Sequence, residues 1–595
     1  MRDFAEQYES RQDRQVLIRF YGYLKPYLLT FIIAFILLIL GTFTGMLLPL
    51  ASGLAIDQMQ NPALSLDQKL WILGIGTGVM LITSGLSTYI SFIQNLMLQK
   101  VGQKITHDIR EQVYTHINTL SINQINQLPV GKLVTRATND PGNISDMFTN
   151  TIVNVIRSIL TMVIIGGILI VISPIMALIT FIVIPLILLA SRFYRQFARV
   201  AYREVRNKVS ELNAFLSEHL SGMKVVQVFQ QQAKVNQQFQ ETNQALKRSS
   251  LKEMYTFAFY RPTLYLLSMV ATLLAIYFGV DSVLKGTLTI GLFVSFYVYV
   301  GQFFEPIQQL SEQLNTLQSS FASAEKIFDV LDTKPEIVDQ KDALALASFK
   351  GKIEFKHVWF AYLPGEWVLK DVSFTIYPNE TVAFVGATGS GKTTILQLIA
   401  RNYEIQKGEI LIDDIPIQTI TRSSLRKHIG QMLQDVFLFS GTVKDNITLG
   451  NESIKDQQLE EAARYVGLDQ VLKDRNTSLQ DVVKERGKNF SSGERQLISF
   501  ARAVVYQPSL MMLDEATANI DSETETIIQA SLEKMMAIST MIIVAHRLST
   551  IQHSDRIFVM QKGEIKESGK HQELLVKKGL YYQLYQLQYE HHQEE

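Results

Sequence analysis

Long runs without a charged residue constrain the first half of this chain most strongly. Five such runs contain no Asp, Glu, Lys or Arg: residues 28–56, 70–99, 158–191, 262–280 and 288–304. The third run is interrupted by Ser173 and Pro174, which predicts two spans joined by a very tight turn. Because about 20 apolar residues cross a bilayer, the pattern predicts six transmembrane helices. Buried core helices of a soluble protein are the less favoured interpretation.

The composition excludes several classes of protein. The chain has 595 residues, of which 47% are hydrophobic and 19% are charged, so we expect several domains and an apolar environment for part of the chain. The formal net charge is zero, and no nucleic acid partner is expected. Since cysteine is absent, disulfides, thiolate zinc sites and cysteine-ligated iron–sulfur clusters are excluded. The polar start "MRDFAEQYESRQDRQ" lacks the apolar core of a signal peptide.

Lys and Arg placement predicts the orientation in the membrane. Both residues are frequent before residue 28, between residues 100 and 157, and between residues 192 and 261, whereas the opposite loops offer only Lys69 and Lys285. Because basic loops stay on the cytoplasmic side, both termini are expected there. The two long basic segments show apolar residues at helical spacing, which predicts stalks reaching on the order of 30 Å beyond the bilayer. The helical pattern breaks at "SINQINQLPVGK" and at "LSGMKVVQ". We interpret these two breaks as contact tips, the ends of the stalks that touch another part of the protein; solvated stalks without contacts are the alternative.

The fold class predicted is an α-helical membrane domain, six transmembrane helices with long cytoplasmic extensions, followed by an α/β domain. Because this second domain contains "GATGSGKTT" directly after an apolar strand, we expect it to be a P-loop ATPase domain. "GKIEFKHVWFAY" and "DVSFTIYPNETVAFVG" have the composition of strands. Strands then alternate with helical stretches, which indicates a largely parallel sheet. We expect the following boundaries: membrane domain 1–325, linker 326–350, nucleotide-binding domain 351–586 and a polar tail 587–595.

The stretch "GATGSGKTT" carries the clearest chemical signal. It follows the apolar strand "TVAFV" and opens a helix, which is the context of a phosphate-binding P-loop. Backbone N–H groups of the loop and the N-terminus of the helix favour phosphate, Lys392 is expected to reach the β- and γ-phosphates of ATP, and Thr393 to bind Mg²⁺. The predicted phosphate-binding residues are Gly386, Ala387, Thr388, Gly389, Ser390, Gly391, Lys392, Thr393 and Thr394.

Further candidate residues follow other strands. "LMMLDEATANID" predicts a buried strand that ends in Asp514, a magnesium ligand, and Glu515, the general base that polarises the attacking water. His546 ends the strand of "IIVAHRLST" and is expected to contact the γ-phosphate. Gln434 follows another strand and is expected to sense both Mg²⁺ and the γ-phosphate, and Tyr362 to stack on the adenine; a structural aromatic is the alternative for Tyr362. The predicted metal ligands are therefore Thr393, Gln434 and Asp514.

These motifs occur in the order and spacing of type I (B-family) ABC exporters. The chain resembles a half-transporter of that family over nearly its whole length, with six spans and one nucleotide-binding domain. The resemblance implies a bacterial cytoplasmic membrane, ATP and Mg²⁺ as cofactors, and a second half-transporter as partner. It also implies that the contact tips are coupling helices, that the second tip docks on the partner's ATPase domain, and that residues 483–487, "VKERG", form the loop that touches the tips.

The signature motif departs from the family pattern. In the family each ATP lies between the P-loop of one domain and the LSGGQ signature of the other; here the sequence is Phe490-Ser491-Ser492-Gly493-Glu494. Ser491 and Gly493 match. Ser492 adds a side chain where backbone must approach closely, and Glu494 brings negative charge toward a phosphate. The loop Ala518-Asn519-Ile520-Asp521 also departs from Ser-Ala-Leu-Asp but keeps Asp521.

This combination favours a heterodimer over a homodimer. The chain resembles the catalytic-glutamate subunit of heterodimeric bacterial multidrug exporters, in which it would hold one competent site while its altered signature, with Glu494, weakens the partner's site. Neutral drift in a homodimer is the alternative. We expect ATP-driven export of amphipathic small molecules, drugs or lipids, from the lipid bilayer. A homodimeric lipid flippase and a nucleotide-gated channel or regulator are the competing functions, and Glu515 argues against the last.

Overall fold

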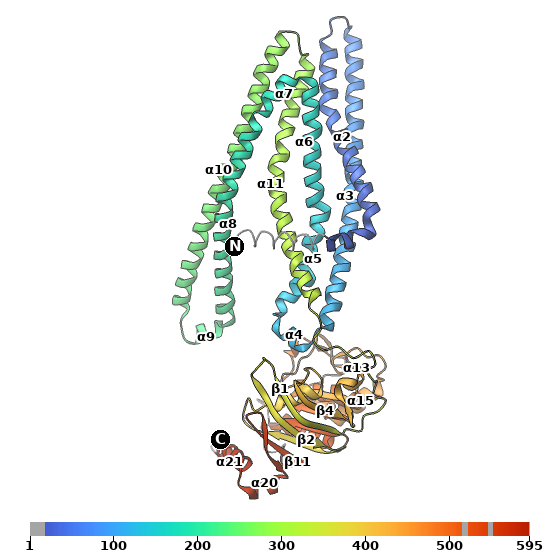
Figure 1. Cartoon of the computed structure of the whole chain (residues 1–595), viewed down its shortest axis with the longest axis vertical. Coiled ribbons are helices and arrows are strands. Elements are labelled where there is room, and N and C mark those ends of the chain that lie inside the picture. Colours follow the sequence, from blue (N-terminus) through green and yellow to red (C-terminus); the bar gives the residue numbers. More distant parts are fainter. Residues whose placement is uncertain (1–17, 515–521, 545–550, 594–595) are drawn as a thin grey trace. The chain divides into compact units, whose positions relative to one another are not determined.

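The structure is a computed structural model that describes residues 18–514, 522–544 and 551–593. The chain divides into two compact units. One comprises residues 1–118 and 130–333, and the other residues 119–129 and 334–595 (Figure 1). We call them the membrane unit and the ATPase unit. A short segment near residue 120 therefore belongs to the second unit although it lies within the first half of the sequence.

The membrane unit consists of long helices, and from residue 18 onward, where its description begins, six helical stretches are long and apolar enough to cross a membrane. The first begins at Ile18 and includes α2; α3 contains 54 residues, about 80 Å at ~1.5 Å per residue. The helices are α2 Leu28–Gln60, α3 Leu66–Thr119, α5 Val130–Asp146, α6 Ile152–Ile172, α7 Pro174–Phe181, α8 Val183–Ser221, α9 Met223–Val228, α10 Gln232–Leu284 and α11 Ile290–Asp332.

The break expected at Ser173 is present. Helix α6 ends at Ile172, Ser173 is extended, and Pro174 is the first residue of α7, the position at which a missing N–H costs nothing. Beyond it, α8 and α10 pack side by side along their length and α9 joins their ends (Figure 1). Helix α11 continues through residues 326–332, the start of the expected linker, because Ile327 and Phe328 are buried against Phe20.

Helices α2 and α11 cross closely at two glycines. A Cβ on Gly53 would lie 2.4 Å from the carbonyl oxygen of Gly291, and one on Gly291 would lie 1.9 Å from that of Gly53. Asp57 accepts hydrogen bonds from Thr289 Oγ1 at 2.6 Å and from the Gly291 backbone N–H at 2.7 Å. The carboxylate thus satisfies the first turn of α11, and small residues let the two backbones meet.

Two main sheets form the ATPase unit. The larger has the order β12-β11-β3-β10-β9-β6, and its strands are parallel except for the edge strand β12. The smaller, β2-β1-β4-β5, is antiparallel and was not predicted. The strands are β1 Ile353–Ala361, β2 Trp367–Ile376, β3 Thr381–Val385, β4 Lys407–Ile412, β5 Ile415–Pro416, β6 Ile429–Met432, β7 Gly441–Thr442, β8 Val482–Val483, β9 Leu510–Asp514, β10 Thr540–Val544, β11 Arg556–Gln561 and β12 Glu564–Gly569.

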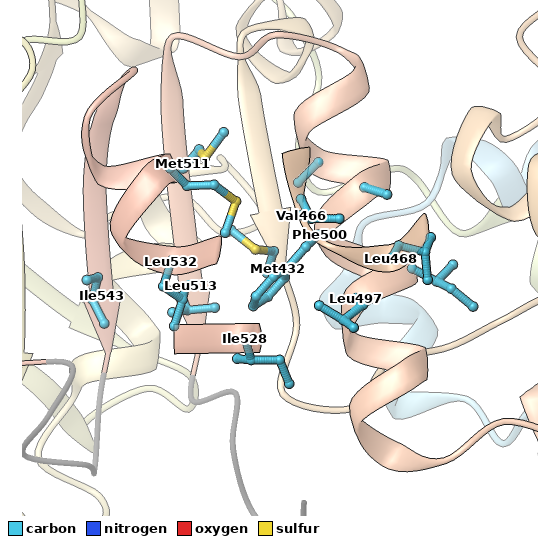
Figure 2. Packing of buried hydrophobic residues seen from close by; sticks show 14 of the residues in the cluster. Met432, Val466, Leu468, Leu497, Phe500, Met511, Leu513, Ile528, Leu532 and Ile543 are labelled. Carbon is cyan, nitrogen blue, oxygen red and sulfur yellow. The ribbon is translucent and has the colours of Figure 1, made fainter. Parts of the chain in front are cut away.

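Helices cover the parallel sheet and fix the site residues through their apolar faces. Leu497 and Phe500 of α17 are fully buried and lie with Met432 and Leu513 of the sheet in one cluster (Figure 2). This packing orients the N-terminus of α17, where the signature begins. The helices of this unit are α4 Ile122–Gln127, α12 Lys392–Ile399, α13 Arg422–Lys427, α14 Val443–Thr448, α15 Asp456–Tyr465, α16 Leu468–Asp474, α17 Ser492–Val505, α18 Ser522–Met536, α20 His571–Lys577 and α21 Leu580–Gln593.

Candidate nucleotide-binding site

The P-loop joins β3 to α12, and its glycines are required by geometry. Gly386 has φ 151° and Gly391 has φ 102°, conformations that side chains disfavour. A Cβ at Gly386 would lie 2.2 Å from the Met560 carbonyl oxygen, and a Cβ at Gly391 would lie 2.6 Å from Leu369 Cδ2. The loop is thus wedged between β11 and β2, with its tip, Ala387, Thr388 and Gly389, exposed to solvent.

Two polar side chains behind this tip face inward. Lys392 is 6% exposed, and its Nζ donates to the carbonyl oxygens of Gly386 at 2.7 Å and Ala387 at 3.2 Å. Ser390 Oγ is buried and has no hydrogen-bond partner among the described residues. A buried hydroxyl without a partner is costly, whereas a phosphate oxygen would satisfy it. The loop therefore fits the phosphates of a nucleotide.

The structure brings two of the three predicted magnesium ligands together. Thr393 Oγ1 donates to Asp514 Oδ1 at 3.1 Å, and Asp514 is 7% exposed at the end of β9. Gln434 is exposed and follows β6, in which Met432 pairs with Leu513 of β9. Because β3, β9 and β6 are parallel strands of one sheet, the segments that follow them, which include all three residues, leave the same edge of that sheet. Oxygen ligands of this kind are those that Mg²⁺ prefers.

Tyr362 lies against the first turn of α12. Its hydroxyl is 3.1 Å from Thr394 Oγ1, and its ring meets the edges of Phe360 and Tyr403 with ring centroids 4.9 and 5.0 Å apart. Burial raises the pKa of the Tyr362 hydroxyl, so it stays protonated at neutral pH. The residue is 40% exposed. An exposed aromatic surface beside the phosphate loop suits the stacking role predicted for it.

The signature residues cap α17. Ser491 is the exposed N-cap: its Oγ accepts from the Glu494 backbone N–H at 3.2 Å, and Glu494 Oε2 accepts from the Ser491 backbone N–H at 2.7 Å. This is a complete capping box. Ser492 and Gly493 form the first turn of the helix. The Glu494 side chain is only 12% exposed and also contacts Arg475 Nη1 at 2.6 Å.

Sequence reasoning missed Arg475. It lies directly after α16, 19 residues before Glu494, and belongs to no motif that we recognised. Only the pairing of a buried carboxylate with a nearby cation could have suggested it, and nothing in the sequence indicates that these two segments meet.

Three predicted residues, Glu515, Asp521 and His546, lie outside the described residues. The neighbouring strands are described: β9 ends at Asp514, and Val544, the last residue of β10, pairs with Asp514 and with Phe384 of β3.

The two predicted contact tips are short helices of different character. At the first, α4, Glu336 accepts from Ser121 Oγ at 2.9 Å and from Asn123 Nδ2 at 3.1 Å, and Gln124 Nε2 donates to the Lys334 carbonyl oxygen at 2.8 Å. These bonds explain why α4 belongs to the ATPase unit. The second tip, α9, belongs to the membrane unit and has no buried residue; Val225, Val228 and Phe229 are 61%, 67% and 68% exposed.

Comparisons with known proteins match both units. Residues 31–307 match the family model described as "ABC transporter transmembrane region", and residues 369–518 match the family model described as "ABC transporter". The chain is 36% identical to the putative ABC transporter ATP-binding protein exp8 of Streptococcus pneumoniae, over 98% of each chain. It is also 36% identical to the probable multidrug resistance ABC transporter ATP-binding/permease protein YheH of Bacillus subtilis, over 84% of this chain and 75% of that protein.

A solved structure of a bacterial Atm1-family ABC exporter with ATP bound superimposes with a TM-score of 0.79 at 25% identity, covering 94% of this chain and 98% of that one. Both the arrangement of spans and the nucleotide-binding fold are therefore shared. The chain belongs to the ABC transporter family and is a type I ABC exporter with fused membrane and ATP-binding domains, a multi-pass membrane protein that hydrolyses ATP in its cytoplasmic domain.

Proposed function

We propose that this chain exports amphipathic small molecules, drugs or lipids, with energy from MgATP bound at residues 386–394. The main support for this MgATP site is the 3.1 Å hydrogen bond between Thr393 Oγ1 and Asp514 Oδ1, which lies beside the buried Lys392. Thr393 and Asp514 would hold Mg²⁺, with Gln434 at the same sheet edge. Bound Mg²⁺ supplies neutralisation of the phosphate charge, while Lys392 and the loop N–H groups hold the phosphates in place.

Hydrolysis is assigned to residues that follow the described strands. Glu515 comes directly after Asp514, so as general base it would take a proton from the attacking water. His546 would contact the γ-phosphate, and Asp521 would face the second nucleotide-binding domain. All three assignments rest on the motif positions in the sequence.

The membrane unit offers a cavity that suits an amphipathic substrate. It has a volume of about 330 Å³ and is lined by apolar side chains of α2, α3 and α6, among them Phe31, Leu98 and Ile156. One wall carries Gln94, which is 2% exposed and accepts a hydrogen bond from Arg157 Nη2 at 3.1 Å. Because Gln94 is buried and bonded to Arg157, the surface of the cavity is almost entirely apolar and suits the apolar part of an amphipathic molecule. The name of YheH, a probable multidrug resistance transporter, agrees with this class.

We propose a second half-transporter as partner because two surfaces of this chain would each have to contact another chain. The partner's ATPase domain would cover the exposed apolar residues Val225 and Val228 of α9 and Phe229, which follows this helix. The signature helix α17 would close over the partner's nucleotide. Exposed apolar patches on a cytoplasmic tip are typical of interaction sites.

We further propose that the partner is a different chain. Ser492 places a side chain in the first turn of α17, where the family resemblance implies glycine and close contact with a phosphate. The other departure, Glu494, is already paired with Arg475, so steric bulk carries more of this argument than charge. A partner with an unaltered signature would complete the site built on Lys392 and Asp514.

Co-purification tests this proposal. The chain, tagged and expressed alone or together with the other half-transporter genes of its source organism, is purified in detergent, and its mass and ATPase activity are measured. We expect high, substrate-stimulated activity only from a complex of two different chains. A fully active species with the mass of two copies would contradict the heterodimer and favour a homodimeric flippase, which lipid translocation in vesicles would then identify.

A further inference from the structure

The carboxylate of Glu494 is held on two sides. Its Oε2 accepts from the Ser491 backbone N–H at 2.7 Å and from Arg475 Nη1 at 2.6 Å. Arg475 is itself fixed: its Nη2 donates to the Asn489 carbonyl oxygen at 3.1 Å, and its guanidinium lies 5.2 Å from the centre of the Phe490 ring. Arg475 therefore contacts three of the residues that surround the start of α17.

Helix capping alone does not need this cation. A capping box forms equally well with Glu or Gln at the third helical position, so the cap would survive with the glutamine that is usual in the family. Glu adds a negative charge, and that charge lies at a helix N-terminus that has to receive a phosphate. Two negative groups within a few ångströms repel each other strongly in a closed interface. A cation at 2.6 Å from the carboxylate removes most of this repulsion.

We propose that Arg475 is a positioning residue of the signature motif. It folds the Glu494 carboxylate back against the helix cap and offsets its charge, so that the positive end of the α17 dipole still attracts a phosphate. The inference rests on the proposed function, because the phosphate belongs to the nucleotide that the second half-transporter binds. Arg475 thus compensates for the glutamate, and the signature retains the ability to bind.

The hydroxyl of Ser491 fits this role. Its Oγ accepts a hydrogen bond from the Glu494 backbone N–H at 3.2 Å, which leaves the hydroxyl proton to be donated outward, since a serine hydroxyl is both donor and acceptor. Ser491 is exposed at the end of the helix. Without Arg475, the Glu494 carboxylate would be free to swing toward the same space and to compete for that proton.

The test compares three variants of the dimeric exporter in lipid nanodiscs. Arg475→Ala frees the carboxylate, and Arg475→Ala with Glu494→Gln removes the charge as well. Lys473→Ala is the matched control, because it removes a nearby cation, two residues before Arg475, that pairs with Asp469 at 3.4 Å. ATP affinity is measured by equilibrium binding of labelled ATP, and hydrolysis as a function of ATP concentration.

We expect Arg475→Ala to weaken ATP binding at the covered site about tenfold, the usual effect of one charge-assisted contact. The double variant should return to within about threefold of wild type, because it lacks the charge that Arg475 cancels. Lys473→Ala should change nothing beyond that margin. Arg475→Lys keeps the cation but cannot donate from two fixed nitrogens to Glu494 and to the Asn489 carbonyl oxygen at once, so it should lose about threefold at most.

A purely structural role would give a different pattern. If Arg475 only braces the loop through Asn489 and Phe490, Glu494→Gln will not restore binding in the double variant, and the proposal is overturned. It is also overturned if Arg475→Ala binds ATP as wild type does. Both outcomes differ from failure of the proposed function, in which Lys392→Ala would leave ATP binding and hydrolysis intact.

Discussion

The P-loop and the signature helix are both built to meet a phosphate, yet they are prepared for it in opposite ways. Behind the P-loop, Ser390 Oγ is buried without a partner among the described residues, and Lys392 rests on two backbone carbonyls of its own loop. At the signature, Ser491, Glu494 and Arg475 satisfy one another. The P-loop therefore buries a hydroxyl that only a ligand would satisfy, whereas the buried carboxylate of the signature is already satisfied within this chain. We infer that the first holds the nucleotide and that the second closes over a nucleotide already held.

The largest effect on ATP hydrolysis is expected from a substitution of Glu515, the residue that follows Asp514. Glu515→Gln should lower ATP hydrolysis by about a hundredfold or more, because it removes a general base, while ATP binding at the P-loop remains. Phosphate release and binding of labelled ATP measure the two quantities separately. Glu533→Gln, a change of an exposed residue on α18, is the control. Turnover near that of wild type would remove Glu515 from the mechanism.

Lys392→Ala tests whether the P-loop holds the nucleotide. The variant loses the cation that faces the phosphates, so ATP affinity at this chain's own site should fall by about ten- to a hundredfold. Titration with a fluorescent ATP analogue measures it, and Lys427→Ala, at an exposed position on α13, serves as control. If the analogue binds the Lys392 variant as tightly as wild type, the P-loop does not hold the phosphates.

Ser492→Gly tests whether the side chain at this position keeps the signature helix away from the phosphate. Removing the side chain lets the backbone of α17 approach a phosphate more closely, and we expect the nucleotide trapped at the covered site to increase severalfold. The substitution should also destabilise the helix by about 0.5–1 kcal/mol, visible as a small drop in melting temperature. Ser492→Ala keeps the Cβ and separates bulk from the hydroxyl. Equal trapping in all three proteins would show that bulk at this position is irrelevant.

The smallest effect is expected for Glu494→Gln alone. Because Arg475 already cancels the carboxylate, and because glutamine keeps the capping box, ATP affinity at the covered site should change by less than about threefold. The measurement is trapped nucleotide in a Glu515→Gln background, which silences this chain's own site. A tenfold gain would instead support the interpretation from sequence, in which the charge of Glu494 faces the phosphate and weakens the site.

The motifs were readable from sequence because each lies in one short segment. The P-loop, Thr393 and Asp514 follow apolar strands, and parallel strands deliver their C-terminal ends to one edge of a sheet. The six spans were equally readable, since charge-free runs of sufficient length have few alternatives. The tight turn at Ser173 follows from proline in the next position.

Features that depend on contacts between segments far apart in the sequence could not be predicted from these motifs. The antiparallel sheet forms because β1 pairs with β2 on one side and with β4 on the other. Since β3 and α12 separate β2 from β4 along the chain, the order of the elements does not reveal this pairing. Arg475 and Glu494 meet only because α16 packs beside α17. The helical continuation of α11 to Asp332 depends on the burial of Ile327 and Phe328 against Phe20, a residue from the start of the chain.

The hydrogen bonds of α4 also determine when the ATPase unit can be completed. Ser121 and Glu336 are 215 residues apart, and ribosomes add about 5–20 residues per second, so about 10 to 40 s separate their synthesis. Until then, Gln124 has only its own capping box and water to bind. The first tip is therefore synthesised well before the domain that it contacts. A nascent chain that stalls before residue 334 would expose this unfinished surface to the quality-control machinery of the cell.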